Sequence, residues 1–244
     1  MDDIILLSIL IFAAGLLYSS VGHAGASGYL AAMALFGLAP EVMKPTALTL
    51  NILVATIATV QFYRAGFFSW NTFLPFAISS IPFAFIGGAM SLPGHTYKQI
   101  VGIVLLFTAY LFFRQRHAAI LKASKPMPVL AAVISGAGIG LLSGAVGVGG
   151  GIFLSPLILF MGWAGTKQTA GVSAMFILVN SIAGMAGHLA SVKFLPDAIG
   201  YWAFAAVLGG VIGSYMGSRR FPNTILYQLL SVVLVIAGVK FMIT

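Results

Sequence analysis

Long apolar runs separated by isolated charges dominate the pattern along this chain. No Asp, Glu, Lys or Arg lies between Asp3 and Glu41, Arg64 and Lys98, Lys125 and Lys167, Lys167 and Lys193, or Asp197 and Arg219. A membrane-spanning helix needs roughly 20 apolar residues, whereas a soluble core would show amphipathic alternation. The pattern therefore predicts an all-α polytopic membrane protein, with its best-marked spans at 46–63, 70–91, 97–113, 169–190, 197–217 and 223–243.

Composition narrows the chemistry. Hydrophobic residues make up 60% of the chain and charged residues 7%, which favours the lipid bilayer as its surroundings. There is no cysteine, so disulfides, Cys–zinc sites and thiol catalysis are excluded. The acidic start, Met1-Asp2-Asp3, and the lack of a small-residue cleavage site argue against a cleaved signal peptide. We expect no cofactor and no metal.

Two glycine-rich breaks interrupt the apolar stretches and resemble each other. Val21-Gly22-His23-Ala24-Gly25 is echoed 125 positions later by Val146-Gly147-Val148-Gly149-Gly150. Downstream, the segment 89–93 is echoed at 218–222. The chain therefore divides into a first transmembrane repeat (1–116), a linker (117–128) and a second transmembrane repeat (129–244).

The positions of the charges predict the orientation. The polar connection 114–128 carries four Lys or Arg residues, so the positive-inside rule makes it cytoplasmic. Threading the spans outward from it places four further cations inside: Arg64, Lys167, Arg219 and Arg220. Both termini fall outside, with all four acids and with Lys44, Lys98, Lys193 and Lys240. The net charge of +8 thus indicates orientation in the inner membrane, and no nucleic-acid partner.

This threading makes the two repeats inverted. Each consists of one glycine-broken segment (4–39 or 129–163) followed by three transmembrane helices. A broken segment can fold as a re-entrant helical hairpin or as two complete crossings, and the pattern leaves both open. In either case each half has an odd number of further spans, so the second half is inverted. Proteins of this kind place a solute site where the broken helices meet.

The breaks predict an anion site. Helices that resume near Tyr29 and Ile152 would present free N–H groups and a positive dipole end, which attract anions. No Lys or Arg lies deep inside a predicted span, since Lys98 and Lys240 are close to span ends, so N–H groups, hydroxyls, amides and histidine must bind the anion. Glycines also serve simply as packing surfaces between membrane helices. The candidate substrate-binding residues are Gly22, His23, Gly25, Ser27, Asn51, Gly147, Gly149, Gly150, Gly151 and Asn180.

His23 and His188 lie near these breaks and spans, and each can be interpreted in functional or structural terms. An ionisable group at membrane depth is a functional candidate, and His23 could protonate during a cycle or hydrogen-bond an oxyanion. The other interpretation is a neutral histidine bonded to a carbonyl. His188 lies near the outer end of its span and reads as interfacial.

The second break carries a family resemblance. The run from Gly140 to Leu157, with its Gly-Val-Gly-Gly-Gly core, followed by Thr169 to Asn180-Ser181 and His188, resembles the TauE/SafE family of membrane transporters. The run from Gly15 to Phe36 is similar to the other repeat of that family, but departs from it at His23-Ala24-Gly25-Ala26-Ser27. The resemblance covers nearly the whole chain and implies export of sulfite and organosulfonates.

These observations predict a secondary transporter, a carrier that exports a small sulfur oxyanion or organosulfonate such as sulfite. A passive small-anion channel is the alternative. An intramembrane enzyme with Ser27 or Ser143 as nucleophile lacks an orienting carboxylate, and a scaffolding subunit is a further class. No GxxxxGK[ST] loop occurs, so a proton or the membrane potential is the simplest energy source. The prediction leaves room for a homo-oligomer.

Overall fold

Helices form the regular structure throughout the part of the chain that the computed structural model describes: residues 2–115, 125–189 and 195–219, with 235, 236, 238, 239, 242 and 243. In chain order they are α1 (Asp2–Ser20), α2 (Ala26–Leu35), α3 (Pro40–Arg64), α4 (Trp70–Ala89), α5 (Gly94–Gln115), α6 (Val129–Val146), α7 (Gly151–Met161), α8 (Thr166–His188) and α9 (Ile199–Arg219). These described residues contain no strand. The prediction of an all-α fold is confirmed.

Among the described residues, six helices are long and apolar enough to cross a membrane: α1, α3, α4, α6, α8 and α9. By contrast, α2 and α7 have 10 and 11 residues, about half the length that a span requires. Four predicted spans correspond to α3, α4, α8 and α9. The predicted span 97–113 lies in α5, which is not one of the six, and 223–243 falls mostly outside the described residues.

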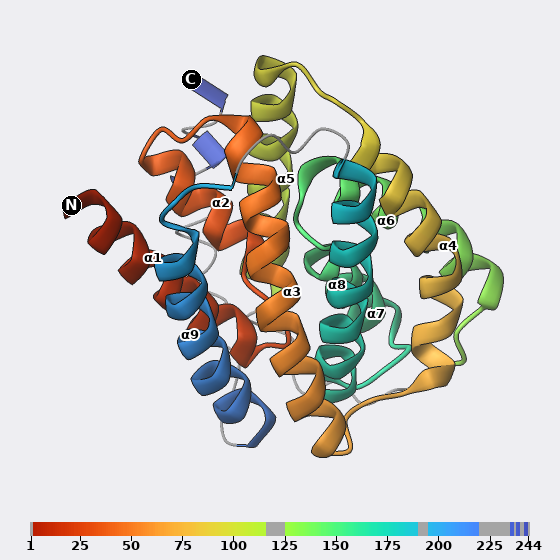
Figure 1. Cartoon of the computed structure of the whole chain (residues 1–244). Helices are drawn as coiled ribbons and strands as arrows, with labels where there is room; N and C mark the ends of the chain where they lie inside the picture. The colour runs from red at the N-terminus through yellow and green to blue at the C-terminus, as the bar shows by residue number, and fades with distance from the viewer. Residues whose placement is uncertain are drawn as a thin grey trace.

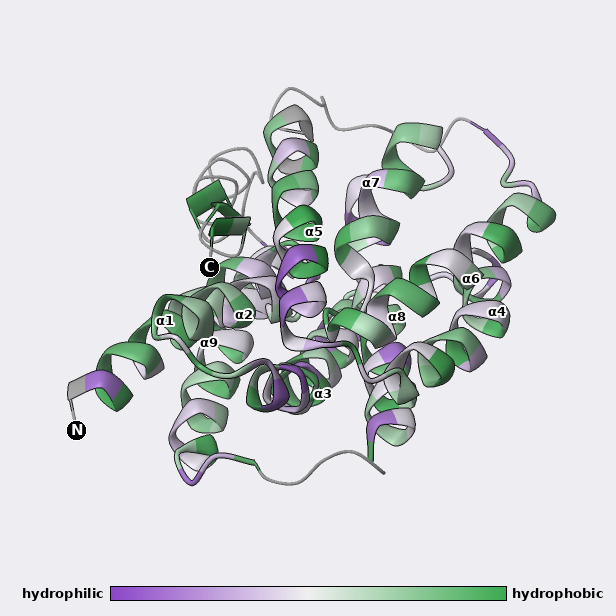
Figure 2. Cartoon of the chain, turned by 90° about the horizontal axis from the view of Figure 1, so that it is seen from above, coloured by the Kyte–Doolittle hydropathy of each residue, from purple (hydrophilic) through white to green (hydrophobic). Residues whose placement is uncertain are grey.

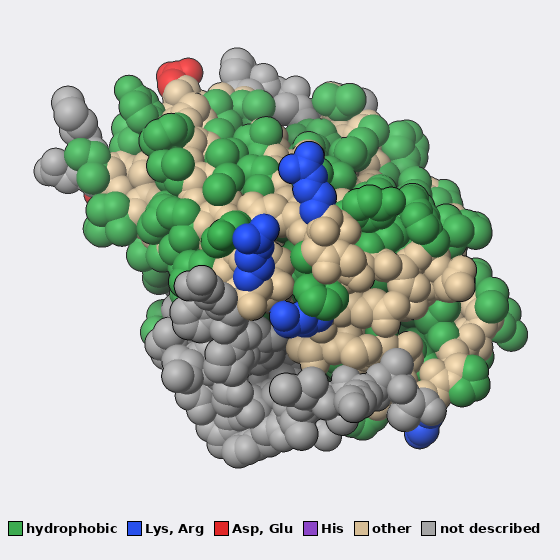
Figure 3. Space-filling view, turned by 90° about the horizontal axis from the view of Figure 1, so that it is seen from below, with side chains coloured by type: hydrophobic (Ala, Val, Ile, Leu, Met, Phe, Trp, Pro, Cys, Tyr) green, Lys and Arg blue, Asp and Glu red, His purple; other side chains and the backbone are tan. Residues whose placement is uncertain are grey.

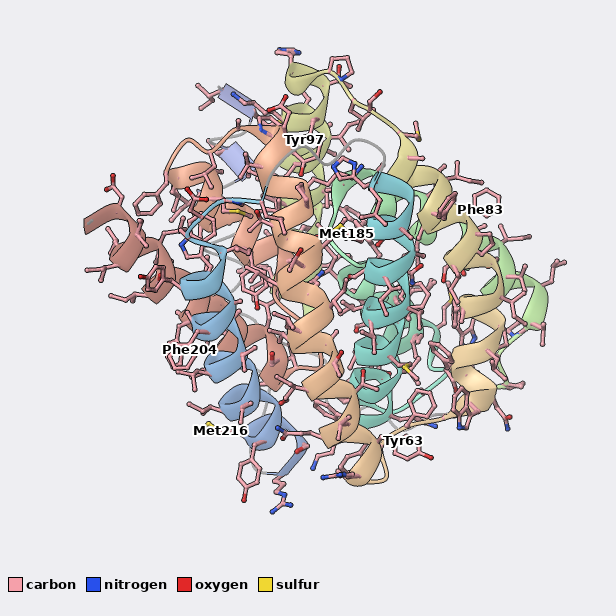
Figure 4. All side chains as sticks on the ribbon, viewed as in Figure 1. Tyr63, Phe83, Tyr97, Met185, Phe204 and Met216 are labelled. Carbon is pink, nitrogen blue, oxygen red and sulfur yellow. The ribbon has the colours of Figure 1, made fainter. Side chains whose placement is uncertain are left out.

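Large apolar side chains cover the outside of the helices. Phe160 is 73% exposed and Leu130 is 71% exposed. The outward faces of the helices are mainly hydrophobic (Figure 2), and Phe83 and Phe204 project away from the bundle on opposite sides (Figure 4). So much exposed apolar surface suits lipid and not water. The chain is a multi-pass membrane protein.

Two antiparallel helices, α3 and α8, form the centre (Figure 1). Asn51 of α3 donates to Ser181 of α8, with 3.4 Å between Nδ2 and Oγ. One turn earlier in α3, Leu48 lies against Gly184, one turn later in α8. The two helices therefore run in opposite directions, and they bring the two halves of the chain together along their length.

The other long helices flank this pair, α1 with α9 on one side and α4 with α6 on the other (Figure 1). Glycines at every fourth position let the backbones approach closely. In α9, Gly209, Gly213 and Gly217 pack on the backbone of α1. In α6, Gly136, Gly140 and Gly144 pack on the backbone of α4. Residue numbers rise together along both partners, so each pair is parallel.

Each broken segment is a long helix followed by a short one. Residues 21–25 separate α1 from α2, and residues 147–150 separate α6 from α7. The glycines at these breaks hold left-handed backbone, with φ of +81° at Gly22, +110° at Gly25, +88° at Gly147, +76° at Gly149 and +82° at Gly150. Residues with a side chain rarely adopt this conformation, which explains why the helices stop here.

Cations gather at one end of the molecule, where α3 and α9 finish and α8 begins. The Lys167 ammonium lies 4.8 Å from the centroid of the Phe67 ring, just beyond Arg64, and donates to the Ser218 carbonyl at 3.4 Å, next to Arg219. Figure 3 shows Lys and Arg side chains on this face. We call it the Lys167 end. The opposite end, where α3 begins and α4 and α8 finish, is the Lys44 end.

One cation differs from the prediction. Lys44 was expected in an outer loop, before a span starting at 46. Instead α3 begins at Pro40, and Lys44 is 4% exposed inside that helix. A Pro in the first turn is compatible with helix because its missing N–H needs no partner there, so the helix extends past the charged residues. Lys44 therefore lies inside the candidate span Pro40–Arg64 and not in a loop before it.

Candidate solute-binding site

The two glycine-rich breaks meet inside the protein. The Nε2 atom of His23, in the first break, lies 3.1 Å from the carbonyl oxygen of Gly151, where α7 begins. His23 is 1% exposed. Because a carbonyl can only accept, His23 donates through Nε2–H, and this assigns the proton to that nitrogen. The contact joins the first half of the chain to the second.

Each break also packs on the central helix of the other half. In the second break, Gly149 lies beside Asn51 of α3, whose Nδ2 would be 2.9 Å from an added Cβ. In the first break, Gly22 packs directly on Ala170 of α8. The breaks are therefore held between α3 and α8, where backbone without a helical partner is shielded from lipid, as membrane depth requires.

Two helix N-termini face this region. Gly25 precedes α2 and Gly150 precedes α7, both in left-handed conformation. The first N–H groups of each helix have no intrahelical acceptor, and the helix dipole gives them partial positive charge. In the first break, the Tyr29 hydroxyl donates to the Ala24 carbonyl at 2.6 Å and fixes the turn. The arrangement can attract an anion without a buried cation.

The glycines also have little room around them. A Cβ at Gly150 would lie 2.9 Å from the Phe176 ring and 3.0 Å from Ile139. A Cβ at Gly151 would meet Ile177. Gly150 thus combines close packing with left-handed backbone.

The predicted polar residues are buried, but they are used differently. Asn180 donates to the Phe176 carbonyl of its own helix at 2.8 Å, while Asn51 reaches across to α8. Among the described residues, the Oδ1 atoms of both asparagines are buried without a hydrogen-bond partner. Ser27 is buried against Tyr18. The structure therefore brings Gly22, His23, Asn51, Gly149 and Gly151 together, while Ser27 lies in the first turn of α2 and Asn180 lies in α8 next to Ser181.

Comparison with known proteins agrees with the fold and these motifs. Residues 7–241 match the family described as "Sulfite exporter TauE/SafE". The chain belongs to this family.

A relative of this TauE/SafE chain is described as "Probable membrane transporter protein y4hK" from Sinorhizobium fredii. The two are 43% identical over 237 residues, which cover 96% of each chain. No solved structure matches the TauE/SafE chain. The protein is a membrane transporter of this family and not an enzyme, which confirms the predicted resemblance and removes the intramembrane-enzyme alternative.

Lys44 of the TauE/SafE chain is a candidate functional residue that the sequence pattern did not identify. Lys44 lies two helix turns before Asn51 on the same face of α3, and an added Cβ at Gly147 would be 3.2 Å from its Cγ. Its Nζ donates to the Gly88 carbonyl at 3.0 Å and the Met90 carbonyl at 3.4 Å. The seven-residue spacing between Lys44 and Asn51 was the signal that could have placed this lysine on the buried face.

Proposed function

We propose that this TauE/SafE protein is a secondary transporter that exports a small sulfur oxyanion or organosulfonate, such as sulfite, and binds it where the two breaks meet. The observation that carries the proposal is the contact between His23 and Gly151, which joins two unwound segments between the central helices. A site built from both halves can change its access when the halves move relative to each other.

We also propose that the two repeats are inverted and that the Lys167 end faces the cytoplasm. Exchanging the halves maps the pair α1–α9 onto α6–α4, both parallel, around the antiparallel pair α3–α8. The cations at the Lys167 end support this orientation by the positive-inside rule. The Lys44 end, with Glu41 and Lys98, would then face outward.

Backbone N–H groups supply the attraction in this proposal. Hydrogen bonds to a charged ligand contribute roughly 1.5–3 kcal/mol each, and two helix ends provide several. A proton gradient or the membrane potential would drive transport, since the sequence has no nucleotide-binding loop of the GxxxxGK[ST] form. His23 would hold the second break in place while the anion occupies the space beside it.

Flux measurements test the function directly. Purified protein in liposomes loaded with radiolabelled sulfite should release it with a rate that saturates, and unlabelled sulfite on the opposite side should drive counterflow. Empty liposomes are the control. A rate that rises linearly with concentration and shows no counterflow would favour the passive channel. No flux of sulfite or of any short organosulfonate would refute the proposed substrate class.

A further inference from the structure

A cavity of about 280 Å³ opens at the Lys44 end, away from the meeting of the breaks. Helices from both halves surround it. Its lining includes Glu41, Lys44, Ser91, Tyr97, Ala145 and His188. The volume suits a small hydrated ion, and the polar side chains come from four separate segments.

Lys44 is the buried cation of this cavity. Its Nζ has three protons and donates two hydrogen bonds among the described residues, to the carbonyl of Gly88 in the last turn of α4 and to that of Met90 just after it. No ion pair to a carboxylate forms at Lys44 among the described residues. Lysine is almost never fully buried unless it is paired, so an unpaired one beside an open cavity indicates that a mobile anion completes its charge balance.

Three other polar side chains lie around Lys44 in this cavity. Glu41, one turn earlier, is exposed at the rim of the cavity. His188 lies close enough to Lys44 for the two to interact electrostatically. The Tyr97 hydroxyl is already engaged, since it donates to the Val146 carbonyl at 2.9 Å. Lys44 is thus the lysine of this cavity, with a proton left to donate to an anion.

Lys44 also connects the cavity with the second break. Ala145 lines the cavity, and Gly147, two residues later, packs on Lys44. Two turns further along α3, Asn51 lies beside Gly149. Cavity, lysine, break and asparagine therefore follow one another from the Lys44 end toward the contact between His23 and Gly151.

The second half of the chain contains a counterpart. Lys44-Pro45-Thr46-Ala47 is repeated as Lys167-Gln168-Thr169-Ala170, at the start of the other central helix. Lys167 donates to the Ser218 carbonyl near the end of α9, as Lys44 does to carbonyls at the end of α4. The hydroxyls of Thr46 and Thr169 are both buried with no hydrogen-bond partner among the described residues. The second half thus repeats the lysine and the unsatisfied hydroxyl, but Lys167 is exposed whereas Lys44 is buried.

We infer that Lys44 binds the transported oxyanion in this cavity, at the mouth of the path to the two breaks, and that Lys167, exposed at the corresponding position of the other half, attracts it at the opposite mouth. The inference rests on the proposed function, because the anion is taken to be the transported solute. It adds a charged binding residue at each end to a site that otherwise offers only backbone dipoles, amides and histidine.

The inference can be tested by replacing Lys44 with cysteine and then restoring the positive charge by chemical modification of the thiol. The chain has no cysteine, so in Lys44→Cys the new thiol is the only one. Unmodified Lys44→Cys should need about tenfold more sulfite for half-maximal flux, the effect of one lost charged hydrogen bond. Alkylation with 2-bromoethylamine restores a cation through a thioether, which sulfite does not cleave, and should recover most of this loss, whereas the anionic iodoacetate and the neutral iodoacetamide should not. Equal flux after all three reagents would overturn the inference.

Matched variants separate charge from folding. Lys98→Gln removes a lysine at the same end outside the cavity and should leave half-maximal sulfite unchanged. Lys167→Gln should raise the half-maximal concentration for sulfite presented from its own side only, and Lys44→Gln from the other side only. Identical sidedness for both variants would contradict the paired assignment. Gel filtration of each variant checks that the protein is folded.

Failure of the proposed function can be recognised separately. If the wild type transports sulfite and Lys44→Gln matches it at all concentrations, the inference fails and the function stands. If the wild type moves no sulfur oxyanion, a thermal-shift panel of chloride, nitrate, sulfate and phosphate decides the site by itself. An anion that stabilises the wild type but not Lys44→Gln supports the site, and equal or absent stabilisation overturns it.

Discussion

His23 and Gly151 lie 128 positions apart in the chain, and a hydrogen bond of 3.1 Å joins the ring Nε2 of one to the carbonyl of the other. The bond spans the two halves of the protein at the point where both helices are interrupted. It fixes where the N-terminus of α7 lies relative to the first break, and the first prediction follows from it.

Replacing His23 with Leu should abolish transport and destabilise the protein. The Gly151 carbonyl would be buried without its donor, which costs about 1–3 kcal/mol of unfolding free energy. His23→Gln keeps an N–H donor and should retain part of the transport activity and part of the stability. The thermal midpoint and sulfite flux of the two variants check this, and equal stability of His23→Leu and the wild type would show that the bond contributes nothing.

Gly150→Val should stop transport. Gly150 has φ of +82°, and a Cβ would lie 2.9 Å from Phe176. A left-handed conformation costs a residue with a side chain about 1–2 kcal/mol, and valine also fills space beside the N-terminus of α7. Gly138→Ala is the matched control, because no heavy atom lies within 4 Å of the added Cβ. Normal flux in a folded Gly150→Val protein would leave this glycine without a role in transport.

The orientation can be mapped with single cysteines at exposed positions. His95→Cys lies at the Lys44 end and Asn71→Cys near the Lys167 end. An impermeant maleimide added to intact cells should label the first, and should label the second only after the membrane is opened. The reverse labelling would show that the Lys44 end faces the cytoplasm. Labelling of both from one side would refute a crossing between these positions by α4.

Glu41→Gln should improve transport at low sulfite concentration. The Glu41 carboxylate lies at the rim of the Lys44 cavity and repels an arriving anion. Exposed charges contribute little, so we expect no more than about a fivefold decrease in half-maximal sulfite, and the gain should shrink as salt rises. Lys44→Gln should instead raise the half-maximal sulfite concentration. An unchanged value in Glu41→Gln would show that this carboxylate does not lie on the path of the anion.

Most of the long helices could be predicted from the sequence because charge-free gaps mark lipid-compatible segments directly. The breaks could be located because clustered glycine is incompatible with continuous helix. Lys44 was expected in a loop, since beside Pro40 and Glu41 it has the composition of one, and its spacing from Asn51 was the only signal of a buried helical position. Its burial depends on carbonyls at the end of α4, of which Gly88 is 44 positions away. Such a contact leaves no local pattern.

The site residues, too, were only partly predictable from the sequence. The pattern identified His23 and the glycines as a group, but the partner of His23 is a backbone carbonyl and carries no side-chain signature. Asn51 and Asn180 looked equivalent as central amides. Only the packing distinguishes the one that crosses to the other half from the one that bonds within its own helix.

The way in which each break packs on the opposite half has a consequence for biogenesis. Gly22 is covered by Ala170, which the ribosome adds almost 150 residues later. Until α8 has entered the membrane, the first break has uncovered backbone polar groups in a medium that cannot satisfy them. The first half therefore stays partly assembled until α8 of the second half has entered the membrane. A chain stopped before Thr166 should be a substrate for membrane quality control and not a stable half-transporter.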